Sequence, residues 1–384
     1  MRIAQVANFY GPSSGGLRTT IHALADGYHR AGHESVVIVP GSSYCVEQVE
    51  WGQLIKVPSW SVPGSGGYQV ITDVDLVCTI LDEVAPDRLE VADRLTLRSL
   101  GWWARERNLP AVMWAHERVD GVIKAFLPFL PARLLADIWN SSTAVRFDAV
   151  VTTTEFAAQE FDRVNSPPVV RVPLGTDLEN FRPSRATEID RRSLMCADED
   201  VLLVTCTRLS KEKEPGLAVD CLRTLVGRGV RARLAILGSG PLEKQLRKAA
   251  RDLPVTFLGY VSDRAQLART LAAADVALSP GPIETFGLAA LEALACGTPV
   301  VASRTSALAE IVTGAAGQAV PPDAGSFADA VLAQLARPEE GRRRAARQRA
   351  EEFPWSNTVR AMLALHGLAL PAKESSTATS PDEF

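Results

Sequence analysis

Residues 275–296 read DVALSPGPIETFGLAALEALAC and contain the most informative pattern of the chain. The apolar run Asp275–Ser279 predicts a buried strand, and the apolar spacing from Gly287 to Cys296 predicts a helix. A strand that leads through a loop into a helix is half of a βαβ unit, and such units build parallel sheets. The segment therefore predicts an α/β fold with a loop at the carboxyl end of a central strand.

The loop and the helix start also have the composition of a binding site. The backbone N–H groups of Phe286, Gly287 and Leu288 lie where a helix start favours a phosphate, and glycine allows close approach. Glu284 lies in the loop, and Glu292 lies about a turn and a half inside the helix. The plain alternative is that Glu284 only favours the helix start and that Glu292 is a solvated helix residue.

The same alternation of strands and helices extends outward over both halves of the chain. In the first half, the predicted strands are Arg2–Asn8, Ser35–Val39, Leu54–Val57, Arg88–Val91, Ala111–Ala115, Asp148–Thr152 and Val169–Val172. In the second half, they are Val201–Cys206, Ala232–Leu237, Val255–Leu258, Asp275–Ser279 and Pro299–Ala302. Helical patterns separate these strands, and the alternation predicts two doubly wound parallel sheets. In such sheets a ligand binds beyond the carboxyl ends of the strands.

The domain organisation follows from this pattern. We expect Rossmann-like domains over residues 1–182 and 188–352, facing each other across a cleft and joined by the polar, proline-bearing linker Phe181–Thr187. A helix over residues 353–370 is expected to return to the N-terminal domain. Residues 371–384 are rich in Ser, Thr, Pro and charge, which predicts a disordered tail.

The overall composition excludes several classes of protein. The chain has 384 residues, 46% of them hydrophobic, and a net charge of −4, so it can bury a core and lacks the basic excess of a dedicated nucleic-acid binder. No apolar run is long enough to span a bilayer, and no targeting signal is visible. The six dispersed cysteines are typical of reduced thiols. We therefore expect a cytoplasmic protein, which lies on a membrane if it meets one.

Two cations follow the first strand of the second domain. Arg208 offers a bidentate guanidinium and Lys213 a point charge, and fixed cations at strand ends suit a diphosphate that gains charge as it leaves. The alternative is a solvated basic loop. Lys211 is a weaker candidate.

Three further positions lie after predicted strands. Gly15 and Gly16 open the first helix and allow close backbone approach to an anion, although a plain tight turn is the alternative. His116 ends the strand Ala111–Ala115, where a histidine can serve a reacting centre or be a structural residue. Val261 follows the strand Val255–Leu258 and is either a base-reading position or an ordinary turn residue.

One acidic pair resembles a metal motif. Asp73-Val74-Asp75 has a D-x-D form, but it stands where a helical pattern begins, so acidic residues in a first helical turn explain it better. We expect no metal site, because Arg208, Lys213 and helix N-termini can replace a metal electrostatically.

With two Rossmann-like halves and the Glu-x7-Glu run, the chain resembles the family 4 retaining glycosyltransferases, which share the two-domain GT-B fold. Within that family it is similar to the mycobacterial mannosyltransferases that use GDP-mannose and phosphatidylinositol mannosides. The stretches that carry the resemblance are residues 5–12 (QVANFYGP), 14–19 (SGGLRT), 93–101 (DRLTLRSLG), 116–118 (HER) and 284–292 (ETFGLAALE).

The resemblance implies roles for the candidate residues. Glu284 would bind sugar hydroxyls, Glu292 the ribose, and Arg208 with Lys213 the pyrophosphate. The Gly15–Gly16 loop would close over the nucleotide sugar, His116 would lie near the reacting centre, and the backbone at Val261 would read the base. GDP-mannose is then a substrate, and no cofactor is required. Thr207 stands where the family more often has glycine, which is a departure from the pattern.

Other activities remain open at this point. The same machinery could use a UDP-sugar or a soluble glycoside, a nucleotide-sugar epimerase shares the architecture, and a non-enzymatic binding protein is a further alternative. No carboxylate is clearly placed as a nucleophile, which favours same-face attack assisted by the leaving phosphate. A lipid acceptor would bring the protein to the inner face of the plasma membrane. Two segments could contact it, Arg94–Arg107 and Val122–Trp139, although both could equally be packed in the core.

Overall fold

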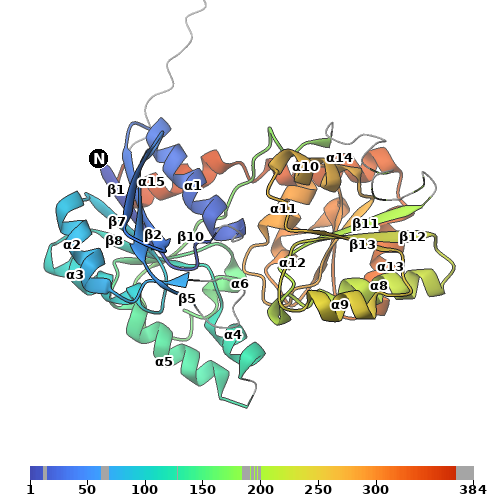
Figure 1. Cartoon of the computed structure of the whole chain (residues 1–384), viewed down its shortest axis with the longest axis horizontal. Coiled ribbons are helices and arrows are strands. Elements are labelled where there is room, and N and C mark those ends of the chain that lie inside the picture. Colours follow the sequence, from blue (N-terminus) through green and yellow to red (C-terminus); the bar gives the residue numbers. More distant parts are fainter. Residues whose placement is uncertain are drawn as a thin grey trace, which may run out of the picture.

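The computed structural model describes residues 1–11, 15–61, 69–127, 129–183, 191, 194, 197 and 200–368. Two α/β bodies lie side by side, one built from the first half of the chain and one from the second (Figure 1). The end of the predicted linker, residues 184–187, and the predicted tail, residues 371–384, lie outside the described residues.

The N-terminal sheet has eight strands in the order β10-β9-β8-β7-β1-β2-β4-β3. They are β1 (Arg2–Ala7), β2 (Glu34–Gly41), β3 (Cys45–Val49), β4 (Gly52–Pro58), β7 (Arg88–Ala92), β8 (Ala111–Ala115), β9 (Ala149–Thr152) and β10 (Val169–Arg171). All neighbouring strands are parallel except the edge pair β3 and β4. A separate small ribbon pairs β5 (Trp60–Ser61) with β6 (Gln69–Val70). The chain order reverses at β1, which places a topological switch point there.

The C-terminal sheet is parallel, in the order β13-β12-β11-β14-β15-β16. Its strands are β11 (Val201–Cys206), β12 (Ala232–Leu237), β13 (Val255–Gly259), β14 (Val276–Ser279), β15 (Val300–Ser303) and β16 (Gly317–Val320). The switch point of this sheet lies between β11 and β14, where Leu203 pairs with Val276. All predicted strands are present, with ends shifted by one or two residues at most, whereas β3, β5, β6 and β16 were not predicted.

Helices cover both faces of each sheet (Figure 1). In the first half they are α1 (Gly15–Arg30), α2 (Val74–Val84), α3 (Leu100–Glu106), α4 (Val119–Phe126), α5 (Ala132–Ala144) and α6 (Glu155–Ala158). In the second half they are α8 (Gly216–Gly227), α9 (Glu243–Ala249), α10 (Arg264–Ala273), α11 (Leu288–Ala295), α12 (Leu308–Ile311), α13 (Ala324–Leu335), α14 (Glu339–Glu351) and α15 (Trp355–Leu365), with a 3-10 turn, η3, at Lys211–Lys213. The start of α2 explains the D-x-D form, because the Asp73 carboxylate accepts a hydrogen bond from the Leu76 N–H at 2.9 Å.

The last helix lies on the first body. In Figure 1, α15 runs beside α1, and the backbone of Gly27 comes so close to Val359 that a Cβ there would lie 2.2 Å from its Cγ2 atom. His366, directly after α15, contacts the buried Glu90 on β7 through its Nε2 atom at 2.8 Å. The helix was predicted to continue to residue 370, and this was wrong. It ends at Leu365, because Gly367 adopts a φ of +69°, the left-handed conformation that ends helices.

The two connections between the bodies run next to each other. The Thr176 N–H donates to the Phe353 carbonyl at 2.9 Å, and the two segments form an isolated parallel bridge between Thr176 and Pro354. Gly175 has no room for a side chain there, because a Cβ would lie 2.4 Å from the Trp355 backbone nitrogen. Arg347 on α14 donates to the Phe181 carbonyl at 2.7 Å and to the Ala295 carbonyl at 2.9 Å, so it ties one connection to the second body.

The structure separates the two candidate membrane segments. In Arg94–Arg107 the side chains of Arg94, Leu97, Leu100 and Trp103 are buried, whereas Leu95 and Trp102 are exposed. The segment Val122–Trp139 instead spans parts of two helices and their connection and exposes six large apolar side chains, which we call the α4–α5 apolar surface. It consists of Leu127, Phe129, Leu130, Leu134, Leu135 and Ile138. Among the described residues, no helix has the length and apolar character needed to cross a bilayer.

Candidate active site

Two helix N-termini meet where the bodies face each other. α1 follows the central strand β1 of the first sheet, and α11 follows the central strand β14 of the second. A Cβ on Gly16 would lie 3.8 Å from the Leu288 Cδ1 atom, so the first turns of these two helices are in contact range. Both termini carry partial positive charge and N–H groups without helical acceptors. The arrangement creates one anion-binding position supplied by both halves of the chain.

The loop before α11 has the conformation that this position requires. Gly287 has a φ of +88°, and a Cβ there would lie 2.5 Å from Leu308, so the sequence needs glycine on both grounds. Phe286 points into the core, where its ring packs edge-on against Phe353 with centroids 6.1 Å apart. Phe286 can therefore act on a ligand only through its backbone.

Lys213 and Glu284 form an ion pair beside the helix termini. The Lys213 Nζ atom lies 2.6 Å from a Glu284 carboxylate oxygen, and both side chains are about a quarter exposed. Gly281 lies beside Lys213, and a Cβ there would make an ordinary contact at 3.6 Å, so the ion pair does not depend on this glycine. Arg208 follows the carboxyl end of β11, the neighbour of β14, and is half-buried. Both predicted cations therefore follow β11, and Lys213 reaches Glu284, which follows the neighbouring strand β14.

Glu292 is buried rather than solvated, which corrects the plain alternative for this residue. Its carboxylate lies 3.0 Å from the Arg264 guanidinium. Burial raises the pKa of Glu292, and the charge of Arg264 opposes that rise. Arg264 itself lies over the Phe181 ring, 4.6 Å from the centroid. Val261 is half-buried in the loop between β13 and α10, three residues before Arg264, which is the first residue of α10. Sequence reasoning missed Arg264, because nothing near it in the chain indicates its acidic partner.

His116 lies at the carboxyl end of β8, directly behind the contact between the bodies. Its ring stacks on Trp114 with centroids 5.1 Å apart and planes 3° from parallel. Burial lowers the pKa of His116 to about 4, the charge of Arg94 acts in the same direction, and Glu90 opposes them. The imidazole is therefore neutral near pH 7 and can donate a hydrogen bond with one nitrogen and accept one with the other.

Thr285, next to Glu284, connects this loop to the first body. Its hydroxyl donates to the His116 carbonyl, and its own carbonyl accepts from Thr153 at 2.9 Å and Thr154 at 2.8 Å. These hydrogen bonds bring His116 of one body next to the Glu284 loop of the other. Sequence reasoning missed all three threonines, because their partners lie more than a hundred residues away in the chain.

A second contact between the bodies uses a helix start. The Glu310 carboxylate accepts from the N–H groups of Glu155 at 3.0 Å and Phe156 at 2.7 Å, the first residues of α6. An acidic side chain at a helix N-terminus is favoured by the helix dipole. In the part of the chain that the structure describes, no group of three or more His, Cys, Asp or Glu side chains could hold a metal ion.

Two family models match the chain. Residues 15–175 match the one described as "Glycosyl transferase 4-like domain", and residues 200–337 match "Glycosyl transferases group 1". A Mycobacterium tuberculosis (strain ATCC 25177 / H37Ra) protein is 48% identical over 96% of each chain; it is a "GDP-mannose-dependent alpha-(1-6)-phosphatidylinositol dimannoside mannosyltransferase". A "D-inositol 3-phosphate glycosyltransferase" of Saccharomonospora viridis is 35% identical over 71% of this chain and 68% of its own.

Solved structures share the arrangement of the two bodies. A sucrose-phosphate synthase from Thermosynechococcus elongatus superposes with a TM-score of 0.79 at 20% identity, covering 95% of this chain and 98% of its own. Anabaena Alr3699/HepE in complex with UDP-glucose superposes with a TM-score of 0.74 at 15% identity, covering 96% of this chain and 100% of its own. At these identities the likeness concerns the fold.

Proposed function

Because the chain belongs to the family 4 (group 1) glycosyltransferases and has their GT-B fold, we propose that it transfers α-mannose from GDP-mannose to a phosphatidylinositol mannoside. The full-length similarity to the mycobacterial dimannoside mannosyltransferase supports an α-(1-6) linkage. The observation that carries the proposal is the meeting of the α1 and α11 N-termini beside the Lys213–Glu284 pair. That arrangement suits a sugar diphosphate held between the two bodies.

In this proposal the diphosphate lies between the helix starts. The N–H groups at Gly15 and Gly16 approach it from one side, and those at Phe286, Gly287 and Leu288 from the other. Arg208 and Lys213 neutralise the charge that develops on the leaving diphosphate, so no metal is required. Lys213 can donate to a phosphate oxygen while it keeps its bond to Glu284, because an ammonium group has three hydrogens.

The remaining predicted residues orient the sugar and the nucleoside. Glu284 accepts hydrogen bonds from mannose hydroxyls, and neutral His116 holds a hydroxyl near the anomeric carbon. Glu292 binds the ribose, with Arg264 holding its carboxylate in place. The backbone at Val261 reads the base. These roles follow the family pattern residue by residue and agree with the positions of the side chains at strand and helix ends.

The reaction transfers one glycosyl group. The acceptor hydroxyl oxygen bonds to the anomeric carbon on the face from which the diphosphate leaves. The bond between that carbon and the phosphate oxygen breaks, with both electrons departing on GDP. The hydroxyl proton passes to the departing phosphate oxygen. This same-face course retains the configuration, and the cations at Arg208 and Lys213 stabilise the separating charges.

A lipid acceptor requires that the enzyme work at a bilayer surface. The α4–α5 apolar surface is suited to that contact: Phe129 is 79% exposed, Ile138 60% and Leu134 58%. Exposed Lys124 and Arg133 lie among these residues and can meet anionic headgroups. α4 begins three residues after His116 and leads directly to this surface, so one helix connects the surface to the residues around His116. We place this contact at the inner face of the plasma membrane.

The proposal is tested by product analysis. Purified protein is incubated with GDP-mannose and phosphatidylinositol dimannoside, and the product is examined by mass spectrometry and linkage analysis. We expect a trimannosylated lipid with a new α-(1-6) bond, and loss of transfer in Glu284→Ala although that variant still folds. UDP-glucose and a soluble mannoside serve as the competing donor and acceptor. An altered free nucleotide sugar would indicate an epimerase, and no product with any pair would contradict the proposal.

A further inference from the structure

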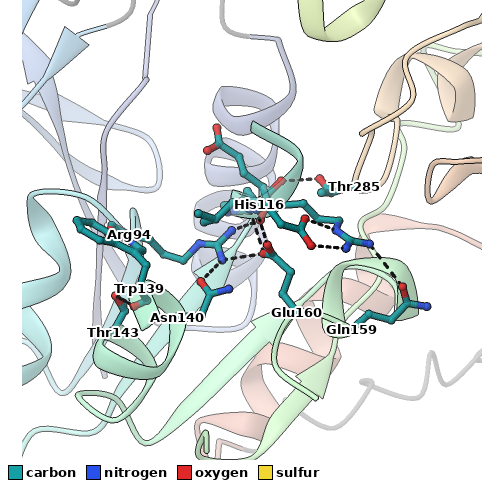
Figure 2. Close-up of polar contacts among 12 residues, drawn as sticks. Arg94, His116, Trp139, Asn140, Thr143, Gln159, Glu160 and Thr285 are labelled. Carbon is teal, nitrogen blue, oxygen red and sulfur yellow. Dashed lines mark hydrogen bonds and ion pairs between the residues drawn. The ribbon is translucent and has the colours of Figure 1, made fainter. Parts of the chain in front are cut away.

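A buried polar cluster lies behind the active-site contact, and the proposed donor chemistry does not use it (Figure 2). Arg94, the second residue after β7, donates to the Asn140 side chain at 2.8 Å and to the Glu160 carboxylate at 3.2 Å. Its second terminal nitrogen donates to the Glu117 carbonyl. The side chains of Arg94 and Glu160 are 6% and 0% exposed, so this is an ion pair inside the protein.

Glu160 holds the same loop from another direction. Its carboxylate accepts from the Val119 N–H at 3.1 Å and from the Asp120 N–H at 2.8 Å, the first two residues of α4. Residues 116–120, which we call the His116 loop, are thus bound at the Glu117 carbonyl by Arg94 and at two N–H groups by Glu160. The guanidinium and the carboxylate also bind each other, so neither can move without the other.

The outer side of the His116 loop is closed by a second pair. Arg118 donates to both oxygens of Asp120, at 3.0 and 2.7 Å, and to the Phe156 carbonyl at 3.3 Å. Arg163 adds a contact to Asp120 at 3.3 Å. Figure 2 shows the Arg94 and Glu160 contacts and the Thr285 hydroxyl converging on the loop around His116. The loop therefore has a fixed position between the N-terminal sheet and the Glu284 loop.

The residue that caps α4 is distant in the sequence, which argues that it does more than stabilise the helix start. Elsewhere in the chain, α2, α10 and α13 begin with an aspartate that accepts from its own first turn: Asp73, Asp263 and Asp323. α4 has no such cap from Arg118, and its N–H groups are bound by Glu160, forty residues away. A local cap would stabilise the helix equally well. A distant, buried cap instead sets where the helix and the loop lie relative to the sheet.

We propose that the buried Arg94–Glu160 pair is a positioning element of the transferase, which sets the place of His116 and of its hydrogen bond with Thr285. This inference rests on the function proposed above and goes beyond it, because neither residue touches the donor. The pair fixes the backbone of the His116 loop at three points. His116 is thereby held where its ring can contact the sugar and where its carbonyl accepts the hydrogen bond from Thr285 of the second body.

The first test separates positioning from stability. Glu160→Gln keeps the shape of the side chain but replaces one acceptor oxygen with an NH₂ group that faces backbone donors. Arg94→Lys keeps the positive charge but loses the planar guanidinium group with its several N–H donors. For the folded fraction of both variants we expect kcat to fall at least about tenfold, while KM for GDP-mannose and Kd for GDP stay within about twofold.

The matched control is Asp275→Asn. Asp275 is another shielded carboxylate that accepts from a backbone N–H, that of Leu202 at 2.8 Å, and pairs with Arg191 and Arg342. It precedes β14, at the end of the sheet away from the site. We expect this variant to lose stability while kcat per folded molecule stays unchanged. An equal loss of kcat in the control would overturn the proposal.

A second readout does not depend on activity. The chain has five histidines, so a ¹⁵N-histidine-labelled sample with His116→Gln as the assignment control resolves the His116 ring by NMR. Arg94 and Glu90 are the charges that act on this ring. We expect shifted His116 signals in Glu160→Gln and a His116 pKa higher by about one unit in Arg94→Met, because a neighbouring positive charge is lost.

The outcomes distinguish the two proposals. If the wild type transfers no mannose but the His116 signals respond as expected, the proposed function fails and the positioning pair stands. If mannose is transferred and Glu160→Gln matches the wild type in kcat and in the His116 signals, the positioning proposal is overturned and the function stands.

Discussion

Lys213 binds a carboxylate in the structure, and the proposed function gives it a phosphate as well. Replacing it with methionine removes one charged hydrogen-bond donor from the diphosphate, so Lys213→Met is expected to weaken GDP binding by about 1.5–3 kcal/mol, roughly ten- to a hundredfold. Isothermal titration calorimetry with GDP measures this. Lys211→Met, two residues earlier and exposed, is the control and should bind GDP like the wild type. Equal losses in both variants would indicate a general charge effect instead.

The lowered pKa of His116 makes stability depend on pH. In the unfolded chain a histidine takes up a proton near its ordinary pKa of 6.5, whereas in the folded chain His116 takes it up only at about 4. Between these values the unfolded state binds more protons, so the free energy of unfolding falls as the pH falls through that window. For a partly exposed ring we expect a contribution of about 1–2 kcal/mol between pH 7 and pH 4.5.

His116→Gln isolates this contribution. Urea unfolding at pH 7 and at pH 4.5 should show a smaller loss of stability in the variant than in the wild type. Other groups with a shifted pKa, such as Glu90, are present in both proteins and cancel in the comparison. A loss of equal size in the two proteins would contradict a lowered pKa at His116.

Among single residues, the sequence predicted those that can be recognised from their position relative to neighbouring strands and helices. Glu284, Gly287 and Lys213 stand at strand ends and helix starts, and the spacing along the chain suffices to find them. Arg264, Thr285 and Glu160 were missed, because each is defined by a partner that only the tertiary structure brings near. Glu160 contacts the backbone of residues 119 and 120, and Thr285 contacts His116, 169 positions away.

At the scale of the elements, the packing of α15 on α1 allows us to predict how a substitution at Gly27 changes the free energy of unfolding. Alanine is the better helix former at Gly27 by about 1 kcal/mol, but its Cβ would lie 2.2 Å from the Val359 Cγ2 atom. Overpacking outweighs propensity here, so Gly27→Ala should lower the free energy of unfolding by about 1–3 kcal/mol. Denaturant titration checks this, and adding Val359→Ala should restore part of the loss. Gly227→Ala, with nothing within 4 Å, should not destabilise.

The α4–α5 apolar surface makes a prediction about membrane binding. Phe129→Ser with Ile138→Ser removes two of its most exposed apolar side chains and should sharply reduce flotation with vesicles that contain phosphatidylinositol. Unchanged GDP affinity shows that the variant is folded. Val226→Ser removes an exposed valine on α8 of the other body and should float like the wild type. Undiminished flotation of the double variant would move the membrane contact elsewhere.

Most elements were predictable from the apolar pattern, and the exceptions have physical reasons. Parallel strands that are buried on both faces, such as β2 and β11, read as continuous apolar runs. β3 reads CVEQV, an edge strand with alternating exposure, and β16 reads GQAV, with one buried residue. Neither contains an apolar run. The Arg94–Arg107 segment has a basic and aromatic composition, but its large apolar side chains mostly point inward, which composition alone does not reveal.

At the scale of the whole molecule, the hydrogen bonds between the two bodies stabilise their arrangement relative to each other. Glu310→Ala leaves the N–H groups of Glu155 and Phe156 without their carboxylate and should favour a more open arrangement. We expect a larger radius of gyration by small-angle X-ray scattering and a lower kcat. GDP affinity should change by less than about twofold, because most of the proposed nucleotide contacts lie in the second body. Glu340→Ala, which removes an exposed surface ion pair on α14, is the control.

The position of α15 also has a consequence for biosynthesis. The first body emerges from the ribosome early, but Gly27 and Glu90 receive their partners Val359 and His366 only when the end of the chain has been translated. Until then the face of α1 at Gly27 lacks the helix that packs on it, and the Glu90 carboxylate has only its donors from the first body, Gln5, Tyr28 and Trp114. The first body therefore cannot complete its packing until the entire second body has been synthesised. In a nascent chain stalled near codon 350, α15 and His366 would still be missing from the first body.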